Sequence, residues 1–381
     1  MAKYRLLYGF LQDEKYSTLG RVMSRYTFHV VSLPHTQTTA EYTHCAYTQK
    51  VRKFCNMMTD LGHEVILYAS EENEARVSEL VTCISKKKQH ELFSNEDHKK
   101  KFFDIVWDPE HIHWTHMNGN VIREMRQRIK PRDFICVIGG LCQKAIADAF
   151  PDNMSVEYGI GYTGTFAKYR VFESYAHMHW VHGYQNDDNG SFYDTVIPNY
   201  YDIEEFPFTK DAEVDDYYLF VGRLIDRKGY RIAQEVCEKL GKRLILAGQG
   251  EFSGYGQHAG VVDVEWRGKL MSHARAVFVP TTYMEPFGGV HAEALLCGTP
   301  VITTNFGVFT ETVVNDVNGY RCDTFQDFVD AVGSIETGKL KRTSIRKAAQ
   351  KRFGTDTVKH EYQRYFDRLY DLWGDGWYTT R

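Results

Sequence analysis

The sequence predicts an α/β protein of two doubly wound parallel-sheet domains. Its 381 residues exceed the length at which one hydrophobic core usually stops growing, so two domains are expected. Both halves alternate short apolar segments with longer amphipathic ones, the pattern of repeated β-α units on a parallel sheet. A content of 43% hydrophobic and 25% charged residues is ordinary for a soluble globular protein.

The first half begins with a predicted β-α-β unit. A strand is expected over residues 28–33, a long amphipathic helix over residues 43–61 and a second strand over residues 63–69. Parallel strands of this kind bind ligands beyond their carboxyl ends. The loop after the first strand, which carries His35 and Thr36, is therefore well placed for binding.

Further β-α units complete the first half. A basic helix is expected over residues 123–132, followed by a strand over residues 133–138 that ends in two glycines. A helix over residues 143–150 and a buried strand within residues 154–164 follow. Residues 3–10 have no assignment beyond a possible strand.

The second half repeats the alternation of strands and helices. Strands are expected over residues 217–221, 243–247, 261–266, 276–279 and 300–303, with a helix over residues 229–240. From about residue 341 the chain is predicted to be helical, and it is amphipathic over residues 357–373.

The stretch T-Y-M-E-P-F-G-G-V-H-A-E-A-L-L-C-G joins one of these strands to a helix that begins at a pair of glycines. Backbone N–H groups of Gly288, Gly289 and Val290 lie at the helix N-terminus, where no glycine Cβ blocks a phosphate. Glu285 before the helix and Glu293 inside it add acceptors for hydroxyl groups. Either acid alone fits a helix cap equally well, but together they indicate a nucleotide-sugar site.

The spacing of Glu285 and Glu293 resembles the E-x7-E signature of the retaining family-four glycosyltransferases. F-V-G-R-L-I-D-R-K-G, which carries Arg223 and Lys228, resembles the phosphate clamp of that family. G-T-P-V-I-T-T, Glu311 and N-G-Y follow in the family's order. The resemblance implies a GT-B fold, in which two Rossmann-like domains face each other across a cleft.

The resemblance also implies roles for individual residues. Arg223 and Lys228 would bind the diphosphate, Glu293 the ribose and Glu285 the donor sugar. Transfer would retain anomeric configuration and need neither an enzymic nucleophile nor a metal ion. No cofactor is expected besides the nucleoside diphosphate sugar as co-substrate, with UDP-sugars favoured. The implied donor-binding residues are Arg223, Lys228, Phe287, Gly288, Gly289, Val290, Glu293, Arg267 and Lys269, and the implied catalytic residues are Arg223, Lys228 and Glu285.

The domain limits come from the same resemblance. V-I-P-N-Y-Y-D resembles the family's V-I-P-N-G-x-D linker, with Tyr200 in place of glycine. We therefore expect an acceptor-side domain over residues 1–198 and a nucleotide-sugar domain over residues 199–354. A C-terminal helix over residues 355–381 is expected to cross back onto the first domain.

The first domain resembles glycosyltransferases of large phages and viruses in its L-P-H-T-Q-T, V-E-Y-G-I-G-Y and R-V-F-E-S runs. It departs from the larger family where many members carry a histidine after a strand, because Gly139 and Gly140 stand there. That role is either missing or taken by His35, His113 or Glu157. The expected acceptor-side residues are His35, Thr36, Gly139, Gly140 and Glu157.

The acceptor stays open at this point. DNA with modified bases is one candidate, because the basic segment 123–132 and the lysine triplets at residues 86–88 and 99–101 suit phosphates. The net charge of −4 argues against a strongly nucleic-acid-binding surface. Three competing functions for such a fold are a nucleotide-sugar epimerase, a phosphorylase and a silent nucleotide-sugar binding module.

Composition bounds the remaining possibilities. The eight cysteines include no C-x-x-C pair, so we expect reduced thiols and a cytoplasmic protein. No apolar run approaches the length of a membrane span, so membrane insertion is not expected. His111, His113 and His116 lie close together but lack further ligands at a suitable spacing, so no metal site is predicted. The oligomeric state is left open.

Overall fold

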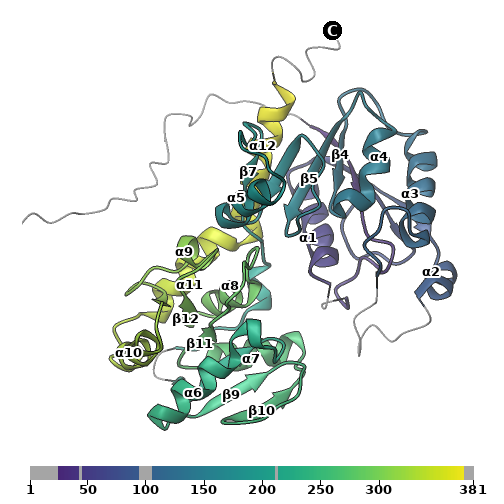
Figure 1. Cartoon of the computed structure of the whole chain (residues 1–381). Helices are drawn as coiled ribbons and strands as arrows, with labels where there is room; N and C mark the ends of the chain where they lie inside the picture. The colour runs from purple at the N-terminus through teal and green to yellow at the C-terminus, as the bar shows by residue number, and fades with distance from the viewer. Residues whose placement is uncertain (1–24, 43–44, 94–104, 211–212, 373–381) are drawn as a thin grey trace, which may run out of the picture.

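The computed structural model describes residues 25–42, 45–93, 105–210 and 213–372 of the 381-residue chain. These residues form two domains, each built on one parallel sheet, as Figure 1 shows. The predicted fold class is therefore confirmed. The possible strand at residues 3–10 and the lysine triplet at residues 99–101 lie outside the described residues.

The first sheet has seven strands in the order β3-β2-β1-β4-β5-β6-β7, all paired in parallel. Its strands are β1 (Thr27–Val31), β2 (Glu64–Ser70), β3 (Glu79–Ile84), β4 (Phe134–Val137), β5 (Met154–Ile160), β6 (Tyr169–Phe172) and β7 (Thr195–Val196). The helices between them are α1 (Ala46–Asp60), α2 (Lys86–Phe93), α3 (Ile112–Met125), the short η2 (Gly140–Gln143), α4 (Lys144–Asp148) and α5 (Tyr175–Tyr184).

The second sheet has six strands in the order β10-β9-β8-β11-β12-β13. Its strands are β8 (Tyr218–Val221), β9 (Leu244–Ala247), β10 (Gln257–Gly260), β11 (Val277–Val279), β12 (Val301–Thr304) and β13 (Gly319–Cys322). Its helices are α6 (Tyr230–Leu240), α7 (Val264–His273), α8 (Gly289–Leu296), α9 (Phe309–Thr312), α10 (Phe325–Glu336) and α11 (Arg342–Phe353), with short turns η3 (Ile203–Glu205) and η5 (Asp226–Lys228).

Both faces of the first sheet are covered by helices, which explains why its strands are apolar on both sides. Phe28 and Val30 of β1 pack on the face that α1 covers, whereas Val31 packs on the face that α3 and α4 cover. The second sheet likewise separates two apolar clusters. Rigid cores on both sides of each sheet fix the strand ends, where the loops that could bind ligands begin.

The last helix, α12 (Thr355–Tyr370), packs on the first sheet although it follows the second domain in sequence. Phe366 lies edge-to-face against Phe28, with ring centroids 4.6 Å apart. Tyr201 and Gly354 form a bridge where the two connecting segments pass each other. The domain limits proposed from the sequence stay a prediction.

Two predicted elements are wrong. Residues 261–266 are not a strand, because the Asp263 side chain caps α7 by accepting a hydrogen bond from the Trp266 amide at 2.7 Å. The predicted basic helix over residues 123–132 is also wrong, because α3 ends at Met125. Pro131 cannot continue a helix, and Arg132 adopts a left-handed φ of 71°.

Candidate functional site

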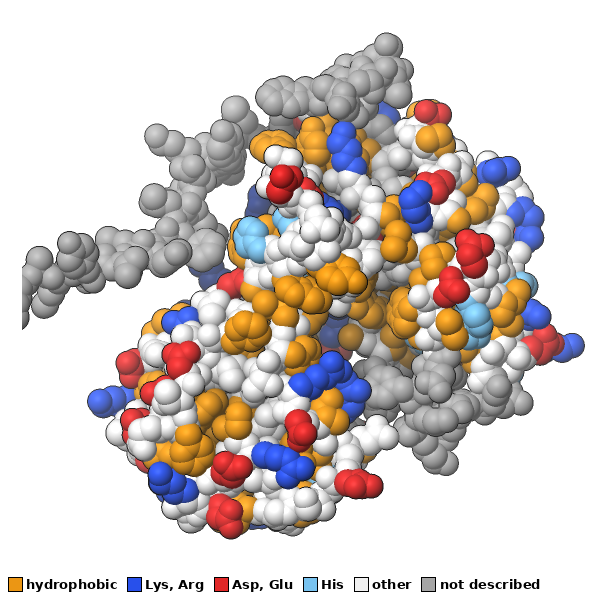
Figure 2. Space-filling model, viewed as in Figure 1, with side chains coloured by type: hydrophobic (Ala, Val, Ile, Leu, Met, Phe, Trp, Pro, Cys, Tyr) orange, Lys and Arg blue, Asp and Glu red, His pale blue; other side chains and the backbone are white. Residues whose placement is uncertain are grey.

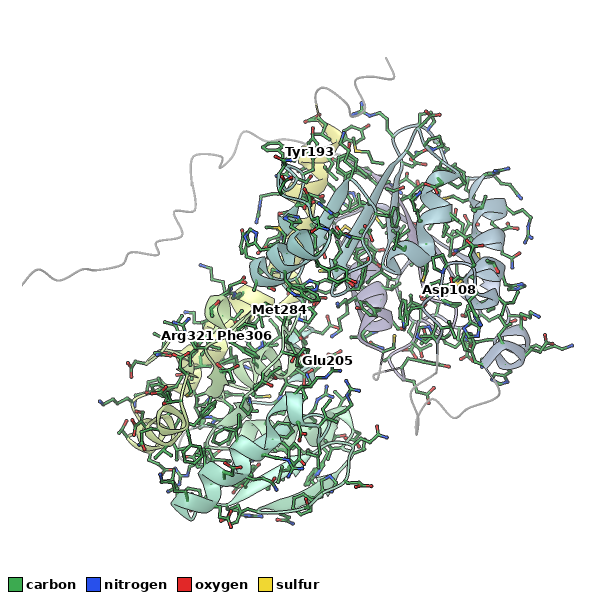
Figure 3. All side chains as sticks on the ribbon, in the orientation of Figure 1. Asp108, Tyr193, Glu205, Met284, Phe306 and Arg321 are labelled. Atoms are coloured by element: carbon green, nitrogen blue, oxygen red, sulfur yellow. The ribbon has the colours of Figure 1, made fainter. Side chains whose placement is uncertain are left out.

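A cavity of about 430 Å³ lies between the two domains, where Figure 2 shows the surface hollowed. Helix α1 forms its wall on the first domain, and α7 with the beginning of α8 forms the wall on the second. Glu205 lies at this junction, as Figure 3 shows. The charged lining residues are Lys50, Arg52, Lys53, Glu205, Arg267 and Glu293. Both walls thus bring charge to one space, as a large polar ligand requires.

Glycines let the strand ends of the second domain approach one another. At Gly229, which has a φ of 74°, a Cβ would lie 2.0 Å from the Pro280 carbonyl oxygen after β11. At Gly248, after β9, a Cβ would lie 1.9 Å from the Gly222 carbonyl oxygen. A side chain fits at neither position. The loops after β8, β9 and β11 are therefore held close together at one edge of the sheet.

Lys228 and Glu285 form an ion pair at this edge. The lysine Nζ lies 2.8 Å from each of the two carboxylate oxygens. The same Nζ stands 5.2 Å from the ring centroid of Tyr283. Burial, and next to it the charge of Glu285, raises the pKa of the Tyr283 hydroxyl. One cation and one carboxylate are thus positioned together, each still partly exposed to solvent.

Arg267 and Glu293 form a second ion pair at the cavity. The Nε of Arg267 lies 2.9 Å from one Glu293 oxygen, and its Nη2 lies 3.3 Å from the other. Tyr201 lies beside them, and burial together with the charge of Glu293 raises its pKa well above the usual range. A Cβ added to Gly289 would lie 3.0 Å from the Tyr201 hydroxyl oxygen. The second pair therefore adjoins the first turn of α8.

The N-terminus of α8 separates the two ion pairs. Gly288 adopts a left-handed φ of 71°, and no side chain caps the helix. A Cβ at Gly288 would lie 3.1 Å from Cγ of Glu285, so glycine permits the close approach of that side chain. Phe287 is buried and Val290 is partly buried, and both anchor the turn to the core. The first amides of the helix lack carbonyl partners within it and favour an anion.

Arg223 and Lys269 occupy different surroundings. Arg223 lies two residues after the end of β8 and is exposed at the edge of the sheet. Lys269 lies two residues after Arg267 on α7, about 200° around the helix. It borders a separate depression of about 410 Å³ and pairs with Glu265 at 2.6 Å. Residues 266–269 lie within α7, and the structure does not bring Lys269, an expected donor-binding residue, to the interdomain cavity.

The residues expected on the acceptor side are largely enclosed within the first domain. His35 is 6% exposed, and burial lowers its pKa to about 3, with His113 as a lesser cause. Its Nε2 lies 3.7 Å from the sulfur of Cys45. The hydroxyl of Thr36 lies 2.6 Å from that of Thr48 on α1. Neither residue lines the interdomain cavity.

Gly139 and Gly140 form a tight turn after β4. Gly140 has a φ of 58°, and a Cβ there would lie 2.6 Å from the Gly164 carbonyl oxygen. The buried side chain of Gln143 accepts hydrogen bonds from the amides of Ile138 and Gly139 at 2.9 and 2.7 Å. The space after β4 is therefore occupied by the Gln143 side chain, which is hydrogen-bonded to the backbone.

Glu157 is completely buried in β5. Its carboxylate accepts hydrogen bonds from the amides of Phe166 and Ala167, each at 2.8 Å, and from the Tyr162 hydroxyl at 3.0 Å. Burial is the largest influence on this carboxyl and raises its pKa to about 7. These contacts tie β5 to the loop that follows it, and they use both carboxylate oxygens.

Sequence reasoning missed the basic wall that α1 contributes. Lys53 pairs with Glu205 at 2.7 Å, and Arg52 pairs with the same carboxylate at 3.4 Å. Lys50 lies deeper and pairs with Glu173 at the end of β6. The run K-V-R-K within a predicted amphipathic helix is the signal that could have indicated this wall. Sequence reasoning also gives no role to Tyr201, which stands in the interdomain linker.

The histidines at residues 111–116 are engaged locally. The Nε2 of His113 lies 3.3 Å from the Leu92 carbonyl oxygen, and its ring packs on Phe93. Within residues 25–42, 45–93, 105–210 and 213–372, no group of three or more His, Cys, Asp or Glu side chains is arranged to hold a metal ion. Over the same ranges, no helix has the length and apolar character needed to cross a bilayer.

Residues 202–352 match the protein family described as "Glycosyl transferases group 1". An uncharacterized glycosyltransferase of Methanocaldococcus jannaschii is 31% identical over 152 residues, covering 33% of this chain and 39% of that protein. A glycogen synthase of Mycobacterium tuberculosis is 32% identical over 158 residues, covering 34% and 36%. The chain thus spans 36 to 39% of the length of these relatives. The family match and these names support a glycosyltransferase.

Solved structures extend the similarity to the whole fold. AviGT4, a glycosyltransferase involved in avilamycin A biosynthesis, superposes with a TM-score of 0.61 at 19% identity, covering 91% of this chain and 98% of that one. Anabaena HepE in complex with UDP-glucose superposes with a TM-score of 0.58 at 16% identity, covering 90% and 99%. At such identities the likeness shows the GT-B fold of two facing parallel-sheet domains.

Proposed function

We propose that this chain, whose second domain matches the group 1 glycosyltransferases, transfers a sugar from a nucleoside diphosphate sugar to an acceptor hydroxyl. One observation carries the proposal. Two cation–carboxylate pairs stand on either side of the α8 N-terminus: Arg267–Glu293 lines the interdomain cavity, and Lys228–Glu285 lies beside Gly288. A nucleoside diphosphate sugar presents an anion between two hydroxyl-bearing rings, which matches that order of groups.

Donor binding would exchange partners within each pair. A diphosphate at the α8 N-terminus competes with Glu285 for Lys228, because both are anions at the same cation. Glu285 released from Lys228 is then free to accept hydrogen bonds from sugar hydroxyls. Glu293 would accept bonds from the ribose in the same manner. The ion pairs keep all four groups in place until the donor arrives.

Cleavage of the donor develops negative charge on the departing phosphate. Arg223, Lys228 and the first amides of α8 would stabilise that charge more strongly in the transition state than before it. Two cations and a helix terminus supply what a divalent metal would otherwise supply, so we propose metal-independent transfer. We further propose retention of configuration, with the acceptor attacking from the face that the phosphate leaves.

UDP-sugars are the first donors to examine, since HepE, a solved structure of the same fold, is described in complex with UDP-glucose. The acceptor is proposed to enter from the side of the first domain. DNA bearing hydroxymethylated bases remains one acceptor to include, on the ground of the phage-like runs in the sequence alone.

The decisive experiment incubates the purified chain with UDP-, GDP- and ADP-sugars, with and without duplex DNA containing hydroxymethylcytosine. Mass spectrometry would identify products, and NMR would give the anomeric configuration of the transferred sugar. Release of nucleoside diphosphate with a retained linkage is expected. Interconversion of sugars without release of nucleotide would instead indicate an epimerase, and failure to bind or consume any donor would contradict the proposal.

A further inference from the structure

Glu173 stands where the first domain meets the donor loop. It is the first residue after β6, at the carboxyl edge of the first sheet. The next residue, Ser174, donates a hydrogen bond of 2.7 Å to the carbonyl oxygen of Pro286. Pro286 directly follows Glu285, which belongs to the proposed donor site. Glu173 is therefore one residue away from a direct contact between the two halves of the site.

A buried cation holds Glu173. The Nζ of Lys50 pairs with its Oε1, and Lys50 also donates a hydrogen bond of 3.1 Å to the Gly159 carbonyl oxygen. Lys50 is 8% exposed and Glu173 is 4% exposed, yet Lys50 lines the interdomain cavity. A buried ion pair of this kind adds little stability over apolar side chains of similar size, because both charges lose their hydration. Its location at the cavity wall points to a role beyond packing.

The second oxygen of Glu173 and the Tyr47 hydroxyl lie near the same point beside Gly161. A Cβ at Gly161 would lie 3.4 Å from Oε2 of Glu173 and 3.4 Å from the hydroxyl oxygen of Tyr47. The carboxylate and the phenol are therefore close enough to contact one small group together. A carboxylate oxygen and a hydroxyl facing one small space form an acceptor and donor set for another hydroxyl group.

Two titratable side chains beside the pair, His177 and Tyr47, are neutral near pH 7. Burial lowers the pKa of His177 on α5 to about 4, and Lys50 adds to that effect. Burial raises the pKa of the Tyr47 hydroxyl, and Lys50 stands 4.7 Å from that ring. Neutral His177 and neutral Tyr47 therefore surround one lysine and one carboxylate.

We propose that Glu173 is the catalytic residue of the first domain that binds and orients the attacking hydroxyl group, and that Lys50 is the positioning residue that holds it. The inference rests on the proposed glycosyltransferase function. The bond from the anomeric carbon to the departing phosphate oxygen breaks as the bond to the acceptor oxygen forms. The proton of the acceptor hydroxyl passes to the Glu173 carboxylate, and the diphosphate departs with its negative charge stabilised by Lys228. Glu173 accepts a hydrogen bond from that hydroxyl and fixes its direction of attack.

The test compares donor binding with donor consumption in Glu173→Gln. UDP binding is measured by calorimetry, and consumption of UDP-, GDP- and ADP-sugars is measured in water and in glycerol, which serve as small acceptors. UDP affinity is expected to stay within about twofold of the wild type, while consumption falls about 100-fold because the attacking oxygen loses its orientation. Glu173→Asp, which keeps the carboxylate, is expected to recover part of the rate.

A second pair of variants separates orientation from folding. The double variant Lys50→Met/Glu173→Leu removes both buried charges together, so it should fold and bind UDP yet lose consumption. Asp194→Asn is the matched control, because Asp194 belongs to another buried ion pair, with Arg170 of β6 at 2.8 Å, outside the cavity. Asp194→Asn should lower the melting temperature, but it should not reduce donor consumption selectively while UDP binding stays normal.

The outcomes distinguish this inference from the function on which it rests. Normal UDP binding and near-normal consumption in a folded Glu173→Gln or double variant would overturn the role of Glu173 and leave the glycosyltransferase proposal intact. A wild-type chain that neither binds UDP nor consumes any of the donors would overturn both.

Discussion

The two domains differ in the polar groups at the carboxyl ends of their strands. In the second domain, the groups at this edge are ion pairs that remain partly exposed, such as Lys228 with Glu285. In the first domain, the corresponding loops are closed by buried polar contacts, such as Gln143 with the backbone after β4. An exposed ion pair exchanges partners readily, whereas a buried hydrogen-bonded group is costly to separate. The ion pairs of the second domain can therefore exchange partners with a charged ligand, whereas the buried contacts of the first domain stabilise its loops.

The difference teaches where the first domain can still contribute chemistry. Polar groups near its strand ends have partners inside the domain, as Glu157 of β5 and Thr36 after β1 do. Charged groups on its cavity wall come from α1 rather than from the loops, and Glu173 joins them through Lys50. The following predictions test this contrast, beginning with the largest expected effect.

Removing a cation from the donor edge should have the largest effect. Arg223→Ala and Lys228→Ala are each expected to lower kcat by about 100- to 1,000-fold, because a preorganised group at the departing phosphate is lost. The melting temperature should change little. Lys347→Ala, at an exposed position on α11, serves as the control. A near-normal rate in a folded Lys228→Ala variant would contradict the phosphate-clamp assignment.

Replacing Glu293 or Glu285 should have smaller effects, and the two variants should differ in UDP binding. Glu293→Ala is expected to weaken binding of UDP by roughly 10- to 100-fold, as expected for a lost hydrogen bond to a charged group. Glu285→Ala should leave UDP binding nearly unchanged and lower the transfer rate, because Glu285 is proposed to contact the sugar and not the nucleotide. Calorimetry with UDP on both variants measures this. Equal losses of UDP affinity would show that the assigned roles are wrong.

A change inside the closed edge of the first domain should act on stability rather than on the donor. Thr36→Val removes the contact with Thr48 and leaves that hydroxyl buried without its partner. The expected cost is about 1–3 kcal/mol in the free energy of unfolding, measured by urea denaturation. UDP affinity should not change. A selective loss of transfer with unchanged stability would place Thr36 in the acceptor site instead.

Removing divalent metal ions is expected to have no effect on the rate of transfer. Chelation with EDTA should leave the rate of transfer unchanged, because Arg223, Lys228 and the α8 amides already oppose the charge of the departing phosphate. Rates with and without added Mg²⁺ or Mn²⁺ complete the measurement. A metal-reversible loss of activity would overturn the proposed metal independence.

Sequence reasoning predicted the fold class correctly, and it could propose the groups of the second domain because these groups are close together in the chain. Glu285, the glycines and Glu293 lie within one turn and one helix, so their spacing alone indicates their arrangement. The Lys50–Glu173 pair of the first domain could not be predicted in this way, because the two residues are far apart in the chain and meet only in the fold. The missed start of α7 has a local origin instead, because the cap formed by Asp263 outweighed a run of β-branched residues.

The return of α12 to the first sheet has a consequence for how the protein is made. Tyr362, Phe366 and Leu369 are fully buried in a cluster with Phe28 and Phe134. Synthesis proceeds from the N-terminus, so these partners of Phe28 leave the ribosome only after the entire second domain has been made. Until then α1 alone covers part of this aromatic face, and contacts over such sequence separations form late. The core of the first domain is therefore completed only after the second domain has been made.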